Sequence, residues 1–289
     1  MKFWVDGGLV DAGSAAVTVL DHGFTVGDGV FETLKVVSDP AEGPVPFALD
    51  RHVARLQRSA EGMGIDGLDP MQARAAMLAV CAANPELAGG GRVRLTLTSG
   101  PGPLGSDRSP GGPTLVVVGS AAAGWPTSTA LALSPWPRNE RSPLTGLKST
   151  SYAENVLALA RAKSHGAGEA LLANLAGDVC EGTGSNTFFV FDGTVTTPPL
   201  SSGCLAGITR ELVLEWCAAA GVATEERRVG IDEITLADEV FITSSTRDVH
   251  PVHTTYDDAG TPLWTGNERP MTTQVATIFA AREKEQWNP

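Results

Sequence analysis

One lysine and one glutamate have the residue types and the spacing to serve a covalently bound cofactor. Lys148 precedes the hydroxyl residues 149–151, which favour the start of a helix, and an apolar-periodic run follows. About thirty residues later, Glu181 lies in residues 179–186 between a short strand pattern and a turn of small residues. The amine of a lysine can form a Schiff base, and a carboxylate can keep a ring nitrogen protonated. Because an isolated lysine is usually solvated, this interpretation depends on the elements around the pair.

Residues 50–60 form a helical pattern that is rich in arginine. Its apolar residues recur on one face, and three arginines occupy a neighbouring face at helical spacing. The apolar residues are Val53, Leu56 and Ala60, and the arginines are Arg51, Arg55 and Arg58. A cluster of guanidinium groups can hold a phosphate, and a solvated surface with salt bridges fits the same pattern.

Two further stretches have the composition of anion sites. Gly207 and Thr209 stand where a helix is predicted to begin, within residues 203–211, so free backbone N–H groups and a hydroxyl point the same way. Residues 243–247 form a second hydroxyl-rich segment at a predicted strand end. Free backbone N–H groups occur at the N-terminus of any helix. Neither stretch therefore indicates an anion site by itself, and only the two together with other residues do.

Composition excludes several classes of protein. The chain has 289 residues, 42% hydrophobic content and a formal net charge of −12, and its Lys and Arg residues do not cluster. An acidic chain of this kind is not expected to bind nucleic acid, which needs basic stripes to neutralise phosphates. No apolar run reaches the length of a membrane span, and the first residues lack a signal-peptide pattern. We therefore expect no membrane segment and a cytoplasmic protein.

Other site chemistries find little support. The four cysteines lie far apart without CxxC spacing and are expected to be reduced structural thiols: Cys81, Cys180, Cys204 and Cys217. His250 and His253 are the only close histidine pair and have no further ligands nearby, so no metal site is predicted. The P-loop, the dinucleotide fingerprint and the GxSxG nucleophile elbow are all missing from the sequence.

The pattern of elements predicts two domains. A small α+β domain is expected over residues 1–119, a linker over 120–128, and a larger cofactor-binding domain over 129–289. In the first domain, residues 16–20 have strand character, and residues 21–29 hold too much glycine for regular structure. Predicted elements of the second domain are helices over 152–165, 208–220 and 272–284, strands over 169–174 and 239–243, and a hairpin of 186–191 with 194–197 across Asp192-Gly193.

Taken together, the chain resembles the class IV (fold type IV) pyridoxal-phosphate enzymes. These comprise D-amino-acid and branched-chain aminotransferases, (R)-selective amine transaminases and 4-amino-4-deoxychorismate lyases. The resemblance rests on Leu147-Lys148, on Glu181 to Asn186, on Leu205 to Thr209 and on the helix segment His52 to Leu56. It implies a two-domain α+β and α/β fold, with a small N-terminal α+β domain, a larger C-terminal domain and the cofactor between them. It also implies a homodimer.

The resemblance assigns roles to individual residues. Lys148 would form the Schiff base with pyridoxal 5′-phosphate and carry the proton during catalysis, while Glu181 would pair with the pyridine nitrogen. Arg55 matches the family's phosphate-binding arginine. The other residues that the resemblance implies for cofactor binding are Asn186, Leu205, Gly207, Ile208, Thr209, Ser245 and Thr246.

Substrate binding is less clearly marked. Residues 27–35 look more like the D-amino-acid transaminase and lyase branch than the branched-chain one, and Thr33 matches a catalytic threonine of the lyases. D-amino-acid transaminases carry an Arg-x-His carboxylate trap where this chain has residues 98–100, which are Thr-Ser-Gly. Arg108 and Arg247 are therefore the candidates for the substrate carboxylate, and the resemblance also implies a place for Phe31 in the substrate site.

These features predict a transaminase. It would move an amino group between a D-amino acid or (R)-amine and a 2-oxo acid through the pyridoxamine form of the cofactor. The second interpretation is an aminodeoxychorismate lyase that releases pyruvate and 4-aminobenzoate. A branched-chain L-amino-acid aminotransferase ranks below both, as does a binding protein without a cofactor.

Overall fold

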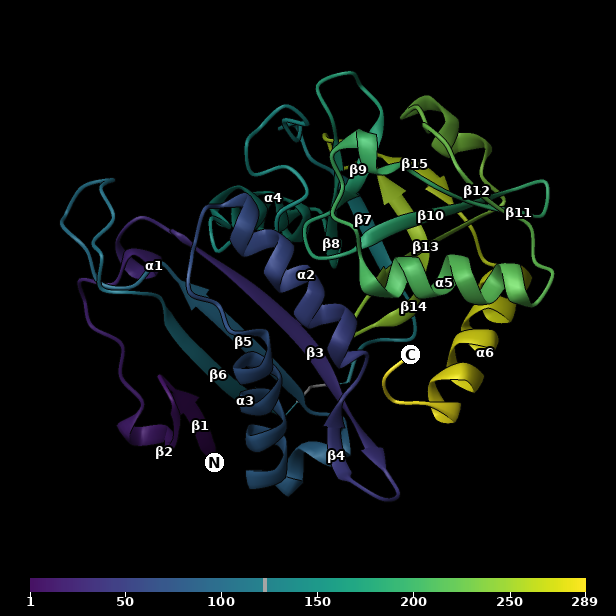
Figure 1. The fold of residues 1–289 in the computed structure, drawn as a ribbon. Helices are drawn as coiled ribbons and strands as arrows, with labels where there is room; N and C mark the ends of the chain where they lie inside the picture. The colour runs from purple at the N-terminus through teal and green to yellow at the C-terminus, as the bar shows by residue number, and fades with distance from the viewer. Residues whose placement is uncertain (122–123) are drawn as a thin grey trace. The chain divides into compact units, whose positions relative to one another are not determined.

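The computed structural model describes residues 1–121 and 124–289, which divide into two compact units (Figure 1). Unit 1 comprises Met1–Ala123, Leu147–Tyr152 and Gln286–Pro289, and unit 2 comprises Gly124–Gly146 and Ala153–Glu285. The predicted linker over 120–128 includes two residues, 122 and 123, that lie outside the described residues. Lys148 lies in unit 1, although it follows the predicted linker in sequence.

Unit 1 contains a six-stranded antiparallel sheet with the strand order β2-β1-β6-β5-β3-β4. The strands are β1 (Lys2–Val5), β2 (Gly8–Asp11), β3 (Gly29–Asp39), β4 (Gly43–Pro46), β5 (Arg92–Thr98) and β6 (Thr114–Ser120). The helices are α1 (His22–Thr25), α2 (Leu49–Gly62) and α3 (Pro70–Ala83), with 3₁₀ turns η1 (Ala12–Ser14) and η2 (Pro85–Gly89).

Helices α2 and α3 pack on one face of this sheet (Figure 1). Leu56 of α2, Met77 of α3 and Leu95 of β5 are fully buried between helices and sheet. α3 begins at Pro70, and the carboxylate of Asp69 accepts a hydrogen bond from the Met71 backbone N–H, as expected at a helix start. This layer leaves the other face of the sheet to carry polar and aromatic side chains.

Two expectations for the N-terminal region are wrong. Residues 16–20 form no strand, because they pair with none of the described strands and expose Val17 and Val19 to solvent. The glycine-rich residues 21–29 include the one-turn helix α1, whose start is capped by the Asp21 carboxylate accepting from the Gly23 N–H. The Asp21 cap therefore stabilises a helical turn that the glycine content of the sequence did not predict.

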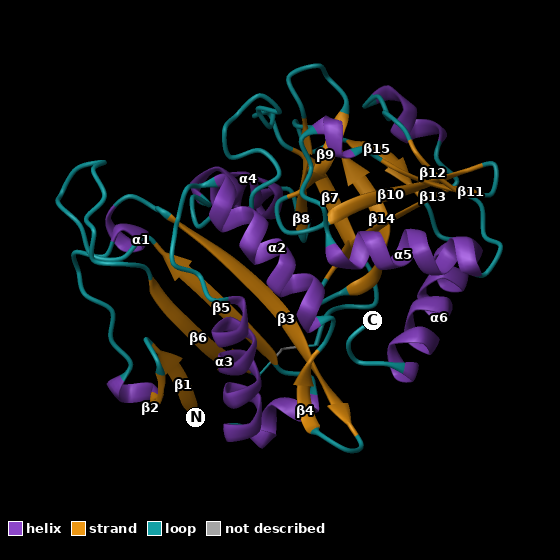
Figure 2. Ribbon diagram, in the orientation of Figure 1, coloured by secondary structure: helices purple, strands orange, loops and turns teal. Residues whose placement is uncertain are grey.

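Unit 2 contains a nine-stranded mixed sheet (Figure 2). Its strands are β7 (Thr129–Leu133), β8 (Glu169–Ala173), β9 (Val179–Gly182), β10 (Asn186–Phe191), β11 (Thr194–Thr197), β12 (Thr224–Glu226), β13 (Glu239–Ser244), β14 (Asp248–Tyr256) and β15 (Pro262–Thr265). The order is β12-β11-β10-β13-β14-β7-β8-β9, with β15 paired to β14. The helices are α4 (Ala153–Ser164), α5 (Ile208–Ala219) and α6 (Pro270–Glu285), with 3₁₀ turns η3 (Leu200–Ser202) and η4 (Asp232–Leu236).

The predicted hairpin of unit 2 is confirmed. β10 and β11 pair across Asp192 and Gly193, which both have positive φ, as a two-residue hairpin turn requires. β10 also pairs with β13, so that Phe188 stacks on Phe241 and Asn186 lies opposite Thr243. Because the two strands are antiparallel, this register places the first residues of β10 beside the last residues of β13, at the same end of the sheet. None of the described helices has the length and apolarity needed to cross a membrane.

Candidate active site

Lys148 is half-buried and fixed by its own backbone in unit 1. Its carbonyl accepts a hydrogen bond of 2.9 Å from the Phe31 N–H, and its N–H donates to the Ser59 hydroxyl of α2 at 3.2 Å. The Thr150 N–H donates to the Gly29 carbonyl at 2.8 Å and extends this attachment to the start of β3. The Lys148 ammonium lies 4.4 Å from the centroid of the Phe31 ring. These contacts distinguish Lys148 from a solvated surface lysine.

Arg55 is buried on the inner face of α2 and is held by Glu32 of β3. Its Nε and Nη2 donate to the two carboxylate oxygens of Glu32 at 2.8 and 2.7 Å, and His52 Nδ1 lies 2.6 Å from the same carboxylate. Burial raises the pKa of Glu32, but the opposing influence of Arg55 and His52 is larger and holds it well below its ordinary value. No sequence motif indicated Glu32, which is buried within a β-propensity run.

The three arginines of α2 have different environments and do not form one cluster. Arg58 is exposed, and Arg51 is half-buried and donates to the Pro289 carbonyl, whereas Arg55 points inward. The three positions lie within about 60° of arc on α2, but they spread over two helical turns, or about 10 Å along the axis, and their side chains have different partners.

Glu181 lies one residue before the end of strand β9 in unit 2, where Leu205 and Arg138 contact its carboxylate. Its Oε2 accepts a hydrogen bond of 2.9 Å from the Leu205 N–H, and its Oε1 lies 3.4 Å from Nη2 of Arg138. Arg138 also donates to the Asn155 side chain at 3.2 Å. The positive charge of Arg138 favours the ionised form of Glu181, which is the form that can accept a hydrogen bond from a protonated ring nitrogen. No motif in the sequence indicated Arg138.

Residues 205–209 form a compact turn into α5. The Asn186 amide donates to the Leu205 carbonyl at 2.9 Å. Gly207 has φ −71°, which any residue can adopt, but a Cβ there would lie 1.9 Å from Asn186 Oδ1. Only glycine therefore fits at this position without a steric clash. The lack of a side chain leaves the backbone at the start of α5 open, and we call this opening the cradle. Ile208 and Thr209 begin α5, where first-turn N–H groups lack helical acceptors, and the Thr209 hydroxyl bonds to none of the described residues.

The turn that follows β13 lies at the same end of the sheet as Asn186. Ser245 and Thr246 lie in this turn, and both are half-buried. Because Asn186 is paired with Thr243, the turn lies on the same edge as Asn186 and the residues that bond to it. The structure thus gathers a carboxylate, a helix start and several hydroxyls within unit 2, and an amine with a buried arginine within unit 1.

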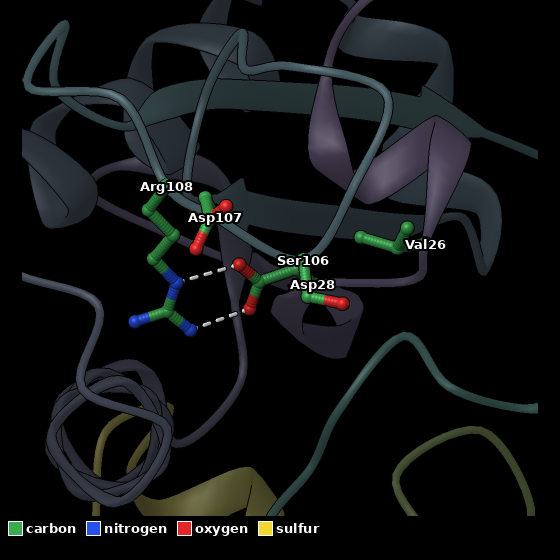
Figure 3. Close-up of a pocket in the computed structure, with 5 residues that line it drawn as sticks. All are labelled: Val26, Asp28, Ser106, Asp107 and Arg108. Carbon is green, nitrogen blue, oxygen red and sulfur yellow. Dashed lines mark hydrogen bonds and ion pairs between the residues drawn. The ribbon is translucent and has the colours of Figure 1, made fainter.

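Arg108 is bound to its own chain. Its Nε and Nη2 donate to the two oxygens of Asp28 at 2.7 and 2.6 Å (Figure 3). It also donates to the carbonyls of Met63 and Gly64. The open pocket around it is lined by Val26, Asp28, Ser106, Asp107 and Arg108. These bonds tie the loop of Arg108 to the rest of unit 1, and its role toward a substrate stays a prediction.

Arg247 is likewise paired. Its Nη1 donates to Glu169 Oε2 at 2.9 Å, and its guanidinium lies 4.1 Å from the centroid of the Trp125 ring. The buried Glu169 carboxylate also accepts from the backbone N–H and the hydroxyl of Thr183. Arg247 thus links the turn after β13 to β8 within unit 2, and its role toward a substrate also stays a prediction.

Comparison with known proteins identifies the family. Residues 29–254 match the family described as amino-transferase class IV. The chain belongs to this family. A D-alanine aminotransferase of Bacillus licheniformis is 31% identical over 289 residues, covering 96% of each chain. A branched-chain-amino-acid aminotransferase of Pseudomonas aeruginosa is 32% identical over 290 residues, covering 96% of this chain and 91% of the relative.

The fold comparison agrees. The structure of the T.th. branched-chain amino acid aminotransferase with pyridoxamine 5′-phosphate superposes with a TM-score of 0.88 at 27% identity, covering 100% of this chain and 95% of the relative. The predicted class IV membership, the two-domain α+β fold and the assignment as an enzyme are confirmed. Placing the branched-chain activity below the D-amino-acid activity finds no support, because relatives of both kinds match at nearly equal identity.

Proposed function

We propose that this class IV enzyme is a pyridoxal-phosphate-dependent aminotransferase that exchanges an amino group between an amino acid and a 2-oxo acid. The observation that carries the proposal is the fixed position of Lys148, whose backbone is bonded to both Phe31 and Ser59. A lysine held in this way can bear a covalent cofactor on its side-chain nitrogen once that amine is deprotonated. The related T.th. enzyme is known with the pyridoxamine phosphate form of the same cofactor.

The residues present fit the phosphate of such a cofactor. The cradle beside Gly207 has no room for a side chain, and the α5 start presents N–H groups together with the Thr209 hydroxyl. Backbone N–H groups and the positive end of the helix dipole both favour a phosphate there. Arg55 would add a guanidinium whose orientation is set by Glu32.

Bound pyridoxal phosphate would supply an electron sink for the charge that develops at the substrate α carbon. The Lys148 amine would take the proton from that carbon and return it in the reverse step. Glu181 would hold a proton on the ring nitrogen, and Arg138 would keep the Glu181 carboxylate ionised and oriented. The Leu205 N–H fixes the second Glu181 oxygen, so the carboxylate keeps one orientation throughout.

For the donor we propose a D-amino acid or (R)-amine. The likeness of residues 27–35 to that branch supports this donor, as does the D-alanine aminotransferase relative. A branched-chain L-amino acid is the alternative donor, and the Pseudomonas aeruginosa relative supports it at least as strongly. An aminodeoxychorismate lyase is a further candidate, since Thr33 matches the catalytic threonine of the lyases. We further propose a homodimer, as the family resemblance implies, which light scattering of the purified protein would test.

The cofactor is tested first. Protein purified with added pyridoxal phosphate should be yellow, and borohydride reduction should leave a stable mass increase on the peptide that contains Lys148. Lys148→Ala should abolish both signals, whereas Lys163→Ala, on the exposed side of α4, should leave both intact. Colourless protein that takes up no label would refute the proposal.

The donor is then identified by half-reactions. The holoenzyme is mixed separately with D-alanine, L-leucine, (R)-1-phenylethylamine and aminodeoxychorismate, and the visible band of the cofactor is followed. Loss of the band with D-alanine or the (R)-amine supports the proposed donor, and loss with L-leucine alone supports the branched-chain activity. Turnover of aminodeoxychorismate without any half-reaction would establish the lyase instead.

A further inference from the structure

The loop between β13 and β14 of unit 2 depends on contacts from outside itself. It consists of residues 245–247, and the Arg247 N–H closes it by donating to the Ser244 carbonyl at 3.2 Å. Asp248, which follows, has a φ of 54°, in the left-handed region that few residues other than glycine adopt. Such a backbone persists where its surroundings hold it. The two hydroxyl residues of this loop are those expected to meet the cofactor phosphate, so the contacts that hold the loop matter for cofactor binding.

Trp125 contacts two consecutive residues of this loop. Its indole N–H donates to the Thr246 carbonyl at 2.8 Å, and the centroid of its ring lies 4.1 Å from the guanidinium carbon of Arg247. The first contact holds the backbone of the loop, and the second orients its cationic side chain through the π face of the ring. Because 45% of its surface is exposed, Trp125 adds little to the core, and its indole can be replaced without emptying the interior.

Glu169 of β8 binds this loop and a second one. Its Oε2 accepts from Nη1 of Arg247 at 2.9 Å, and its Oε1 accepts from the Thr183 N–H at 3.1 Å and from the Thr183 hydroxyl. The Ser185 hydroxyl also donates to Oε2, at 3.5 Å. Thr183 and Ser185 lie in the loop that joins β9 to β10. One fully buried carboxylate therefore ties the two loops together.

The two loops would meet different parts of the same cofactor. The hydroxyls of loop 245–247 are expected at the phosphate, and loop 183–185 follows closely on Glu181, which is expected at the ring nitrogen. A rigid aromatic ring sets the distance between these two parts of pyridoxal phosphate. Both protein groups can therefore bind at full strength only when their own spacing matches that distance. Contacts that fix the spacing before the cofactor arrives reduce the ordering that binding requires.

We infer that Arg247 is a positioning residue that, with Trp125 and Glu169, fixes the spacing between loop 245–247 and Glu181. The inference deepens the proposed function and rests on it, because it concerns the same cofactor. It gives Arg247 a role that needs no substrate carboxylate, in keeping with its existing bond to Glu169. Loss of the guanidinium should therefore weaken cofactor binding and leave substrate binding unchanged, whereas loss of an arginine that binds the substrate would have the reverse effect.

The first test measures cofactor binding without a covalent bond. Pyridoxamine 5′-phosphate has an amine in place of the aldehyde and cannot be linked to Lys148, so it is titrated into the full chain after bound cofactor has been removed. Arg247→Met should raise its Kd by about tenfold or more, because the bond to Glu169 and the contact with Trp125 are both lost. Arg247→Lys should have a smaller effect, because it keeps the charge but lacks the planar fork.

Arg227→Met is the matched control for this titration. Arg227 also lies in unit 2, pairs with two glutamates and has its guanidinium carbon 4.9 Å from the centroid of an aromatic ring. Its partners, Glu225, Glu233 and Phe191, lie outside the candidate site. The Kd of pyridoxamine phosphate should therefore change less than about twofold in this variant.

A second variant makes the test independent of the buried ion pair. Trp125→Phe keeps an aromatic ring beside Arg247 and removes the indole N–H that bonds to the Thr246 carbonyl. The Kd of pyridoxamine phosphate should rise about threefold to tenfold, as expected for the loss of one hydrogen bond. The Tm of the cofactor-free protein should change by less than about 2 °C, because the replaced side chain is so exposed.

Steady-state kinetics then separate positioning from substrate binding. At saturating pyridoxal phosphate, the KM of the substrate that proves active should stay within about twofold in Arg247→Met. A raised KM with an unchanged Kd for pyridoxamine phosphate would overturn the inference in favour of a substrate role. An unchanged Kd in Trp125→Phe would also overturn it. Failure of the proposed function would show itself differently, because the unaltered protein would then bind no pyridoxamine phosphate and would carry no chromophore on Lys148.

Discussion

Replacing Glu32 by glutamine should destabilise the protein severely. Glu32 is fully buried, and its two oxygens accept three hydrogen bonds of 2.6 to 2.8 Å from Arg55 and His52. A glutamine keeps the shape but offers one acceptor oxygen and turns an NH₂ donor toward the donors of its partners. The Arg55 charge then stays buried without a counter-charge. Removing one partner of a buried ion pair costs about 3–5 kcal/mol, and we expect a loss in this range for Glu32→Gln.

Urea unfolding, followed by far-UV circular dichroism, measures this loss. Glu61→Gln is the matched control, because it makes the same chemical change on the exposed face of α2 and should cost less than about 0.5 kcal/mol. A triple variant, Glu32→Leu with Arg55→Met and His52→Leu, should recover much of the stability, since apolar residues of similar volume often replace a buried ion network at little cost. A loss below about 1 kcal/mol for Glu32→Gln would refute the idea that Arg55 depends on this carboxylate.

The same network predicts the direction of acid sensitivity. The folded state holds the pKa of Glu32 well below its ordinary value of 4.5, so the unfolded chain binds the proton more readily. Glu32 therefore contributes its full stabilisation above about pH 4.5, and this contribution declines as the pH falls below that value. Between pH 5 and pH 3 the free energy of unfolding of the unaltered chain should fall more steeply than that of Glu32→Gln.

Three further predictions concern other parts of the chain. Burial, with repulsion from Arg247 and Arg269, lowers the pKa of His250 to about 4 from 6.5, so stability should decrease as the pH falls from about 6.5 to about 4, and His250→Gln should flatten the unfolding free energy in that window. Because burial raises the pKa of Cys81 to about 12 and the four free cysteines are all buried, a disulfide reagent should label them slowly in the native protein and rapidly in urea. Gly207→Ala should weaken pyridoxal phosphate binding at least about tenfold, measured by fluorescence titration, because its Cβ would collide with Asn186, whereas Gly230→Ala, whose Cβ has ordinary contacts, should have little effect.

Elements with local signals were predictable from the sequence. The hairpin at Asp192 and Gly193, the proline-initiated α3 and the start of α5 at Ile208 all follow from patterns contained within a few residues. Residues 16–20 show the limit of this approach, because their β propensity finds no partner among the described strands. Strand formation needs a partner that lies elsewhere in the chain, and propensity alone carries no information about it.

The site residues divide in the same way. Lys148, Glu181 and Gly207 stand in short motifs, and the structure gives each an environment of the kind the proposed chemistry needs. Glu32 and Arg138 belong to no local motif. Each acts through a residue on another element, with Glu32 on β3 bound to α2, and Arg138, before α4, paired with β9.

Charge pairing decides which arginines of this acidic chain can serve a substrate. The sequence singled out Arg108, on the loop that follows residues 98–100, and Arg247, where relatives usually have a small residue, but each already has a carboxylate of the chain at 2.6 to 2.9 Å. A substrate would have to compete with that internal anion, which is present at high effective concentration and needs no ordering. The cost of displacing Asp28 from Arg108, or Glu169 from Arg247, therefore opposes both assignments unless the incoming carboxylate gains further contacts.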